Sequence, residues 1–355
     1  MKKVTALLSV FLLVGLLLFF EASLLAESCS EPDMVMIPAG SFKMGSEEFS
    51  NAMPVHEVTL SNDFYIGKYE VTNQEFADIL NYALSKDYID KAPLAEHIEK
   101  KTVKCVSKSP QKLLDLDDSD CQIDYIKGRF KPVHGKGNFP VVEVSWYGAA
   151  FYCNILSEQE GLDKLYNLDD WTCQVYGKSG YRLPTEAEWE YVARFKDQRL
   201  YPWGRAKPDA SFANYHSNVG GTVEVGRFSP KGDNALGVSD LAGNVAEWCN
   251  DWYDEYEEDS EETDPVGPPS SPLIYIPPVK RYWPLRVVRG GSWRYDPTNV
   301  EMGVPFTIDS VIHSESIQSS FRSFDYPALT RPVEGFRVVK TVVTKKTVTK
   351  TSAGQ

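Results

Sequence analysis

Cysteine and histidine are the residue types of this 355-residue chain whose spacing could support metal or redox chemistry. The six cysteines include no Cys-x-x-Cys pair, which weakens a zinc-knuckle or thioredoxin-like interpretation. The five histidines are scattered and include no His-Glu-x-x-His motif, so a zinc or iron site built from histidine has no support. The cysteines lie at positions 29, 105, 121, 153, 173 and 249, and the histidines at positions 56, 97, 134, 216 and 313.

The charge balance limits the classes of partner. The chain carries 37 Lys and Arg against 50 Asp and Glu, for a net charge of −13. With no compensating basic block, a phosphate-binding surface is absent from the sequence and nucleic acid is excluded as a partner. The acidic run at 254–259 precedes a Pro-rich stretch and indicates a solvated loop, with a calcium-collecting surface as the alternative.

The first 28 residues have the pattern of an export signal. Two lysines are followed by the apolar run Ala6–Phe20, which as a helix would span only about 22 Å at ~1.5 Å per residue. That is short of the ~30 Å hydrocarbon core, and we expect cleavage near Ser28–Cys29. The protein is therefore expected in the periplasm, at the cell surface or in the medium. Lipid attachment at Cys29, although Glu27 suits a lipoprotein signal poorly, and an uncleaved membrane anchor are the alternatives.

Export changes the interpretation of the cysteines. In an oxidising compartment, disulfides are expected among the four central cysteines, and four cysteines allow three pairings. Cys249 is left over, and is either buried or available to Cys29. The four central cysteines are Cys105, Cys121, Cys153 and Cys173.

The elements that would position these residues are short. Capping boxes at Thr72 and Thr185 predict helices from residue 73 to about 84 and just after 185, and Ser145 caps a helix that ends near Gly161. These helices alternate with strands and long loops, which indicates an α+β class in which loops carry function. Strands are predicted within 34–44, 56–69, 286–293 and 335–343, a hairpin between 113–116 and 122–130, loops over 208–240 and 251–278, and a basic Thr/Lys-rich tail over 341–355.

Eight motifs, in order, resemble the formylglycine-generating enzyme (sulfatase-modifying factor) family. They cover about residues 34–340. The motifs are Met36-Ile-Pro-Ala-Gly-Ser-Phe-Lys-Met-Gly45, Tyr65-Ile-Gly-Lys-Tyr-Glu-Val-Thr-Asn73, Pro140-Val-Val-Glu-Val-Ser-Trp146, Tyr181-Arg-Leu-Pro-Thr-Glu-Ala-Glu-Trp-Glu190, Tyr201-Pro-Trp-Gly204, Leu241-Ala-Gly-Asn-Val-Ala-Glu-Trp248, Arg289-Gly-Gly-Ser-Trp293 and Gly335-Phe-Arg337.

The resemblance implies one domain over residues 34–340 with a variant C-type-lectin-like fold, low in regular structure and often calcium-bound. Relative to the family pattern, the segments near 85–138 and 161–180 are insertions.

The chain departs from the family at its catalytic residues. The family oxidises a substrate cysteine to an aldehyde with oxygen and copper held by two thiolates, which suit Cu(I). The matching positions are Tyr295 and, without a gap, Val300, and no cysteine follows Cys249. No catalytic residue is therefore assigned and copper is not expected. The iron-dependent sulfoxide chemistry of the broader family would need a histidine cluster that the chain lacks.

The family's disulfides have also changed. Cys153 matches a family cysteine whose partner position is Val338 in this chain. A new partner for Cys153 is expected, with Cys173 or Cys121 as the candidates.

The resemblance implies calcium in the Gly-Asn-x-x-Glu-Trp loop. The ligands carried over are the Asp240 and Glu247 carboxylates with the Gly243 and Val245 carbonyls, a hard-oxygen set suited to calcium. The alternative is a structural turn in which Glu247 pairs with an arginine. A second calcium would use Asn214 and the carbonyl of Tyr215, but the family's downstream acidic ligand falls at Ser217.

The family binds an extended peptide in a groove beside its cysteines. Here the matching groove would be lined by Trp293, Arg294, Tyr295 and Arg322, with Trp293 equally suited to the core. These observations predict an exported module that binds or assembles with an exported protein, peptide or glycan. The membrane would be reached only through a lipid at Cys29. The alternative is an oxidase of the family with relocated active residues.

Overall fold

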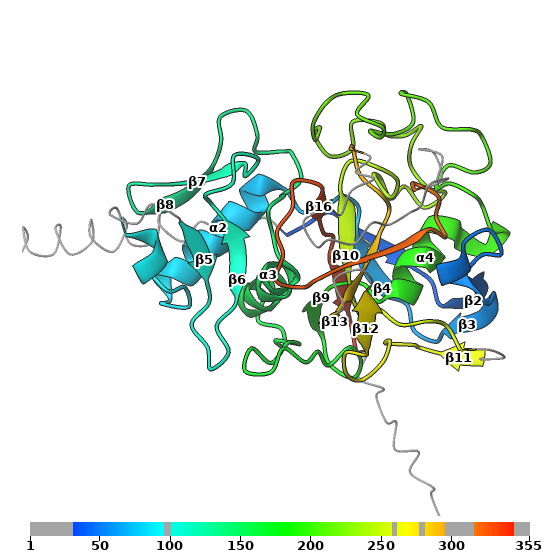
Figure 1. Cartoon of the computed structure of the whole chain (residues 1–355), viewed down its shortest axis with the longest axis horizontal. Coiled ribbons are helices and arrows are strands. Elements are labelled where there is room, and N and C mark those ends of the chain that lie inside the picture. The colour runs from blue at the N-terminus through cyan, green and yellow to red at the C-terminus, as the bar shows by residue number, and fades with distance from the viewer. Residues whose placement is uncertain (1–30, 96–100, 258–260, 277–280, 295–315, 344–355) are drawn as a thin grey trace, which may run out of the picture. The chain divides into compact units, whose positions relative to one another are not determined.

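The computed structural model describes residues 31–95, 101–257, 261–276, 281–294 and 316–343. All of these except Glu31 belong to one compact unit, Pro32–Gln355. The described residues of this unit form small sheets and three α-helices (Figure 1), which confirms the predicted α+β class. In the part of the chain described, no helix is long and apolar enough to cross a membrane.

Two four-stranded sheets carry most of the framework. The first has the order β1-β4-β17-β9 and joins the beginning of the unit to its end, with antiparallel neighbours. The second has the order β15-β14-β10-β16, in which only the β10–β16 pair is parallel. Their bounds are β1 Met34–Ile37, β4 Phe64–Gly67, β9 Gly180–Arg182, β10 Ala246–Trp252, β14 Arg286–Arg289, β15 Arg322–Asp325, β16 Glu334–Gly335 and β17 Val339–Thr341.

Smaller sheets and 3-10 turns complete the strand structure. One three-stranded sheet has the order β11-β3-β2, and three pairs of strands stand separately. These elements are β2 Gly40–Met44, β3 His56–Leu60, β11 Glu261–Thr263, β5 Thr102–Lys104 with β6 Lys112–Asp115, β7 Ile123–Ile126 with β8 Arg129–Pro132, β12 Leu273–Ile276 with β13 Arg281–Pro284, and the turns η1 Ser50–Ala52, η2 Ala92–Leu94 and η3 Phe195–Asp197. The predicted strand segments 34–44 and 56–69 each contain two strands that belong to different sheets.

The three helices begin where their capping residues predict. Helix α2 (Asn73–Ser85) and helix α4 (Glu186–Arg194) both have complete capping boxes, at Thr72 and Thr185. Helix α3 (Trp146–Gln159) is capped by Ser145, whose Oγ accepts from the Gly148 amide at 3.1 Å. Each cap accepts a hydrogen bond from an otherwise free amide of the first turn. The start of each helix can therefore be predicted from a few residues.

The predicted hairpin in the first insertion is wrong. Strand β6 pairs with β5, which precedes it, and β7 pairs with β8. The β7–β8 turn is formed by Lys127 and Gly128, with φ of 51° and 79°. Two successive left-handed residues match the twist of a two-residue hairpin loop, so this turn, not the apolar run 113–116, sets the pairing.

Strand β6 docks on helix α3 through a close backbone approach. A Cβ on Gly148 would overlap the carbonyl oxygen of Leu113 in β6. Most of α3 is buried, and Phe76 of α2 stacks on Tyr152 of α3 with ring centroids 5.8 Å apart. Another core cluster includes Trp189 and Tyr191 of α4 and packs this helix against strands of both four-stranded sheets and of the β11-β3-β2 sheet.

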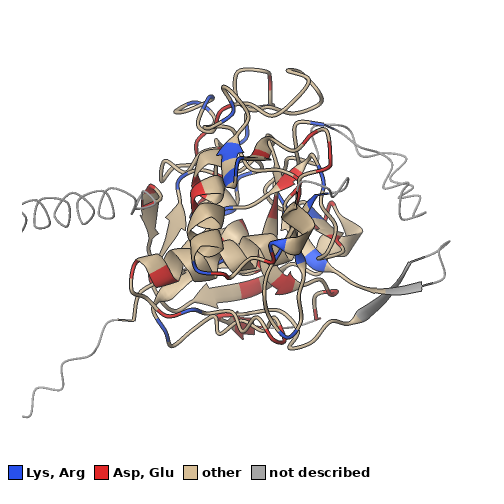
Figure 2. Ribbon diagram, turned by 90° about the vertical axis from the view of Figure 1, so that its left-hand side faces the viewer, with Lys and Arg blue, Asp and Glu red and all other residues tan. Residues whose placement is uncertain are grey.

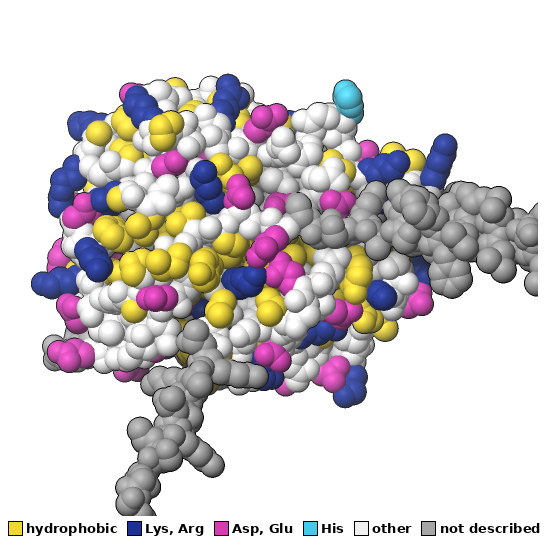
Figure 3. Space-filling model, turned by 180° about the vertical axis from the view of Figure 1, so that it is seen from behind, with side chains coloured by type: hydrophobic (Ala, Val, Ile, Leu, Met, Phe, Trp, Pro, Cys, Tyr) yellow, Lys and Arg dark blue, Asp and Glu magenta, His cyan; other side chains and the backbone are white. Residues whose placement is uncertain are grey.

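Charges of both signs are interspersed over the unit. Figure 2 shows acidic and basic residues mixed along the same elements, without a continuous basic face in that view. From behind, hydrophobic side chains gather in a band on the surface (Figure 3). Exposed Met36 of β1 pairs in register with exposed Tyr65 of β4, so apolar side chains stand side by side on this sheet.

Candidate functional site

The loop that leads into β10 has a backbone that few residues can adopt. Asp240, Gly243 and Asn244 all have positive φ, between 57° and 82°. A Cβ on Gly243 would overlap the carbonyl oxygen of Asn214, so glycine is required there for both φ and space. This conformation places the predicted ligand Asp240 against Gly226 and the predicted ligand Glu247 against Arg337.

Glu247 is held by a buried arginine. Both side chains are 0% exposed. The guanidinium of Arg337 donates to both oxygens of Glu247, at 2.6 and 2.7 Å, and Trp189 Nε1 donates to Oε2 at 2.8 Å. The pairing of Glu247 with an arginine, offered above as an alternative to calcium, is therefore present in the structure.

A third carboxylate, which the sequence analysis did not single out, joins this loop. Glu70, just after β4, accepts from the Val245 amide at 3.1 Å and from Asn244 Nδ2 at 2.6 Å. Burial, together with the charges of Asp240 and Glu247, raises the pKa of Glu70 well above its usual range. One feature of the sequence could have identified Glu70. It is the acidic residue of the matched motif Tyr65–Asn73.

Negative charge is in excess around this loop. Burial raises the pKa of Asp240 to about 6, although its carboxylate accepts from the Gly226 amide at 2.5 Å. Arg337 is the cation that acts on both Glu70 and Asp240, so one guanidinium faces three carboxylates. Carboxylate oxygens with uncompensated charge suit a hard divalent cation. Among the described residues no three Asp, Glu, His or Cys side chains form a complete metal-binding group. A bound ion would thus need carbonyl or water oxygens as well.

The second predicted calcium position lies against the same loop. Asn214 is fully buried, and its Nδ2 donates to the Gly221 carbonyl at 2.9 Å and to Asn244 Oδ1 at 3.2 Å. Its own Oδ1 is buried without a hydrogen-bond partner, so one oxygen there is available to a cation. The Tyr215 carbonyl instead accepts from the Asn218 amide at 3.0 Å.

The structure describes three of the four predicted groove residues, and one of these three is buried. Trp293 and Arg294 lie together, with the guanidinium 5.4 Å from the indole centroid, and both are half-buried. Tyr295 lies outside the described residues. Arg322 is 2% exposed and lies inside the unit, where it donates to both oxygens of Glu186 at 2.7 and 2.8 Å. A surface role for Arg322 is therefore corrected, because its charge is needed to balance a buried carboxylate.

Trp293 is tied to both candidate calcium loops. Its amide donates to the Asn244 carbonyl at 2.8 Å, and its carbonyl accepts from the Ser217 amide at 2.6 Å. The preceding Gly290 carbonyl accepts from the Gly243 amide at 2.9 Å. The segment Gly290–Arg294 thus takes its position from the loops that carry Asp240 and Asn214.

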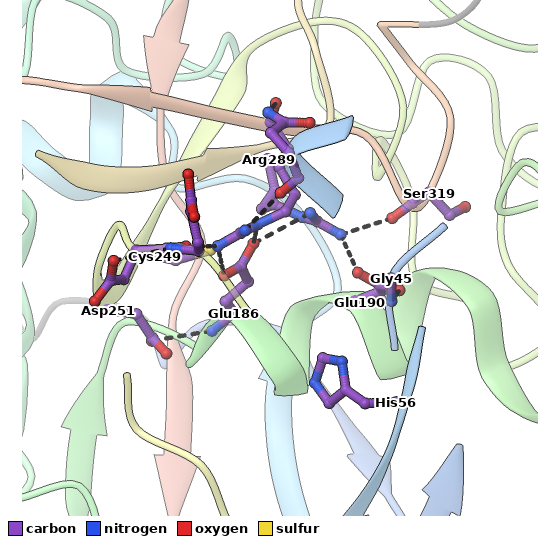
Figure 4. Close-up of polar contacts among 12 residues, drawn as sticks. Gly45, His56, Glu186, Glu190, Cys249, Asp251, Arg289 and Ser319 are labelled. Carbon is purple, nitrogen blue, oxygen red and sulfur yellow. Dashed lines mark hydrogen bonds and ion pairs between the residues drawn. The ribbon is translucent and has the colours of Figure 1, made fainter. Parts of the chain in front are cut away.

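Helix α4 carries a second buried network of charges. Figure 4 shows Arg289 of β14 between the carboxylates of Glu186 and Glu190, with the Ser319 carbonyl completing the guanidinium's contacts. Asp251 accepts from the Glu186 amide at the start of α4, at 3.0 Å. Burial and the nearby Glu186 charge raise the pKa of Asp251 to about 8. Glu186 and Glu190, the α4 carboxylates of this network, both form ion pairs with buried arginines. The network therefore stabilises the fold and is not an open binding site.

The cysteines in the described part of the chain are free thiols. The predicted disulfide among Cys105, Cys121, Cys153 and Cys173 is not formed in the structure. Burial raises the pKa of Cys153 well above its usual range, and the Cys173 thiol adds to this shift, so Cys173 is the nearer candidate partner. Cys249 is 0% exposed in β10, in agreement with the buried alternative, and burial raises its pKa as well.

Comparisons with known proteins identify the domain. The profile of the sulfatase-modifying factor enzyme 1-like domain matches residues 21–342. The serine/threonine-protein kinase Pkn1 of Chlamydia trachomatis is 33% identical over 267 residues, which cover 74% of this chain and 33% of the kinase. The chain thus spans about a third of that relative's length.

A second relative is an enzyme named for this domain, and a solved structure shows a similar fold. The formylglycine-generating enzyme of Mus musculus is 30% identical over 263 residues, which cover 67% of this chain and 63% of the enzyme. The structure of Treponema denticola variable protein 1 superposes with a TM-score of 0.57 at 25% identity, covering 86% of this chain and 94% of that one. The chain therefore belongs to the formylglycine-generating enzyme family, whose shared unit is the sulfatase-modifying factor enzyme 1-like domain.

Proposed function

We propose that this chain is a binding or assembly module of its family that has lost the copper-dependent oxidation of cysteine. The observation that carries the proposal is the absence of any cysteine after Cys249, which leaves the segment from Gly290 onward without the thiol pair that Cu(I) requires. Cys249 itself is fully buried in β10, and its raised pKa disfavours the thiolate. The copper centre of the family enzymes therefore does not fit the residues present.

The proposed function includes export. The basic start, the apolar run Ala6–Phe20 and the small residues before Cys29 support transfer across a membrane. We place the mature protein in the periplasm, at the cell surface or in the medium, with lipid at Cys29 as the route to a membrane. Mass spectrometry of the mature N-terminus checks this point, because cleavage before Cys29 and acylation of its thiol give different masses.

Calcium fits the loop before β10 as a structural ion. The Asp240 and Glu247 carboxylates would hold it with carbonyl oxygens of Gly243 and Val245, and Glu70 adds a further carboxylate on the same loop. A bound calcium would supply positive charge where one guanidinium faces three buried carboxylates. A second ion would use the buried Asn214 Oδ1, which has no hydrogen-bond partner.

The ligand surface of the proposed module is the segment Gly290–Arg294. Trp293 and Arg294 present an aromatic ring and a guanidinium side by side, a combination enriched at recognition surfaces. The Trp293 amide donates to the Asn244 carbonyl and the Trp293 carbonyl accepts from the Ser217 amide, and these two hydrogen bonds couple this surface to the proposed calcium loops. An extended peptide, an exported protein or a glycan suits such a surface.

The decisive experiment is an oxidation assay with a direct product measurement. The mature chain is incubated with copper, oxygen and a cysteine-containing peptide of the sulfatase type, and the intact peptide mass is recorded. A catalytically competent formylglycine-generating enzyme serves as the matched control. We expect the peptide thiol to stay intact with this chain and to become an aldehyde with the control. Conversion by this chain would overturn the proposal and assign catalysis to another thiol pair.

A further inference from the structure

Strand β1 lies at the edge of the sheet β1-β4-β17-β9, and only every second residue of β1 bonds to β4 through its backbone. The Lys68 amide donates to the Asp33 carbonyl at 2.7 Å, so these two residues form a hydrogen-bonded pair next to the ladder. Such pairs alternate along two antiparallel strands, and in this register the next one on β1 falls at Val35. The backbone groups of Met34 and Met36 therefore point away from β4, towards the open side of the edge.

The outward backbone groups of Met34 and Met36 have no partner in the described part of the chain. No hydrogen bond there reaches the N–H or the C=O group of either residue on the open side of β1. An unpaired row of donors and acceptors at the edge of a sheet is a template for a further strand. Strand β1 can therefore accept one additional strand.

The side chains at this edge are apolar. Met36 is 48% exposed and lies beside Tyr65 of β4, which is 39% exposed. On the opposite face of β1, Val35 packs against the core cluster that contains α4, but it is only partly buried. Strand β1 has no charged residue, although natural edge strands commonly carry one to prevent pairing. Both faces of β1 thus leave apolar surface that a partner strand would cover.

We propose that β1 pairs with β1 of a second copy of this chain, antiparallel about a twofold axis at Val35. In this register Met34 of each copy lies opposite Met36 of the other, and every outward N–H and C=O group of the two residues is used. The two Val35 side chains meet at the axis on the inner face. On the outer face, Met36 lies between Tyr65 of its own copy and Met34 of the other. The apolar surface therefore continues across the axis.

Two prolines select this register. In the alternation along β1, the next positions after the two methionines are Pro32 and Pro38, and proline has no N–H to donate. A twofold axis at Met34 would place Met36 opposite Pro32, and an axis at Met36 would place Met34 opposite Pro38. Both arrangements leave a carbonyl without a donor. The axis at Val35 satisfies all the outward groups, so the edge is complementary to itself.

The charges of the chain determine how strong this pairing is. Each copy has a net charge of −13, so two copies repel each other, whereas β1 itself carries no charge that opposes pairing. The ladder is only four residues long, which is typical of a small and transient interface. We therefore expect a weak dimer that becomes stronger as salt screens the repulsion. The inference needs neither the ligand surface nor the calcium loops of the proposed function.

The first test measures the molar mass of the mature chain against its concentration by sedimentation equilibrium. A thiol reductant is present so that Cys29 forms no disulfide. We expect a monomer–dimer equilibrium for the unsubstituted chain. Met36→Lys places a charge on each side of the axis and should raise the dissociation constant of the dimer by about tenfold or more. The matched control is Ile126→Lys in β7, where the isoleucine is 51% exposed, and it should dimerise as the unsubstituted chain does.

The second test follows hydrogen exchange of single amides by NMR in the unsubstituted chain. The amides of Met34 and Met36 should exchange rapidly in dilute solution and become protected as the protein concentration rises. The Val35 amide, which faces β4, should be protected at every concentration. This measurement decides the question even where a variant does not fold, and circular dichroism checks the folding of both variants.

Several results would overturn the proposal. One is a chain that stays monomeric at concentrations up to about 1 mM, because weaker pairing is no specific interface. Another is a dimer that Met36→Lys leaves unchanged, or that Ile126→Lys weakens equally. Protection of the Met34 and Met36 amides by phosphatidylcholine vesicles, with no dimer in their absence, would assign the edge to a lipid surface instead.

Discussion

At the scale of single residues, buried carboxylates divide into those matched by an arginine and those that are not. Glu186 and Glu190 of α4 are matched by Arg289 and Arg322. Around Glu247, one guanidinium serves several carboxylates. Removing an arginine should therefore lower the free energy of unfolding most where few other cations lie near the same carboxylates.

Replacing Arg337 with Met should destabilise the chain strongly. It leaves Glu247, Glu70 and Asp240 buried without their cation, and we expect the free energy of unfolding to fall by about 3–5 kcal/mol near neutral pH. Urea unfolding in the presence of a chelator measures this effect. The matched control is Arg199→Met, whose partner Asp197 is largely exposed, with an expected loss of about 0–1 kcal/mol. Equal losses in the two variants would contradict the argument.

The raised pKa of Asp251 makes the free energy of unfolding depend on pH, and the direction of this dependence follows from the direction of the shift. Its pKa is about 8 in the folded chain and about 3.9 when unfolded, so between these values the folded state retains a proton that the unfolded state has lost. The contribution of Asp251 to stability is complete below pH ~4 and declines as the pH rises towards ~8.

Asp251→Asn should therefore be more stable relative to the unsubstituted chain at pH 8 than at pH 5. The amide oxygen can still accept from the Glu186 backbone, so the helix start is retained. Urea unfolding at the two pH values measures the difference, with Asp124→Asn on the exposed part of β7 as control. A difference that does not change with pH would contradict a raised pKa for Asp251.

At the scale of elements, the contact between α3 and β6 tests how the insertion is attached. Glycine to alanine inside a helix normally stabilises it by about 1 kcal/mol. At Gly148 the new methyl group would overlap the Leu113 carbonyl, and we expect a net loss of about 1–3 kcal/mol in the free energy of unfolding. Thermal or urea unfolding gives the value. Gly221→Ala, at a site with open space, should be close to neutral, and stabilisation by Gly148→Ala would show that β6 does not pack this closely.

At the scale of the whole molecule, calcium should stabilise the unit through the loop before β10. With calcium at about 100 times its Kd, the expected gain is about 2.7 kcal/mol in the free energy of unfolding. Melting temperatures with calcium and with chelator measure this gain. Asp240→Asn should abolish most of the difference. An equal calcium effect in that variant would place the ion elsewhere.

Sequence was sufficient where the cause of a structure is local. The capping residues Thr72, Ser145 and Thr185 act within one helical turn, and all three helices begin where these residues predict. The ordered motifs identified the family in the same way, because each is a continuous stretch of chain. The predicted hairpin is wrong because the left-handed residues Lys127 and Gly128 set the pairing of β7 with β8, and the apolar run 113–116 pairs with β5 instead.

Tertiary structure alone decided which charges meet. Glu70 reaches Asn244 across 174 positions of sequence, and Arg322 reaches Glu186 across 136. No periodicity or spacing encodes such contacts, because they arise when separate strands and loops pack and lose water together. The sequence by itself determined the helix starts, the family and the absence of any cysteine after Cys249. The packed fold determined that Arg322 is a buried counter-ion and that Glu70 joins the loop before β10, since burial makes each charge depend on its spatial neighbours.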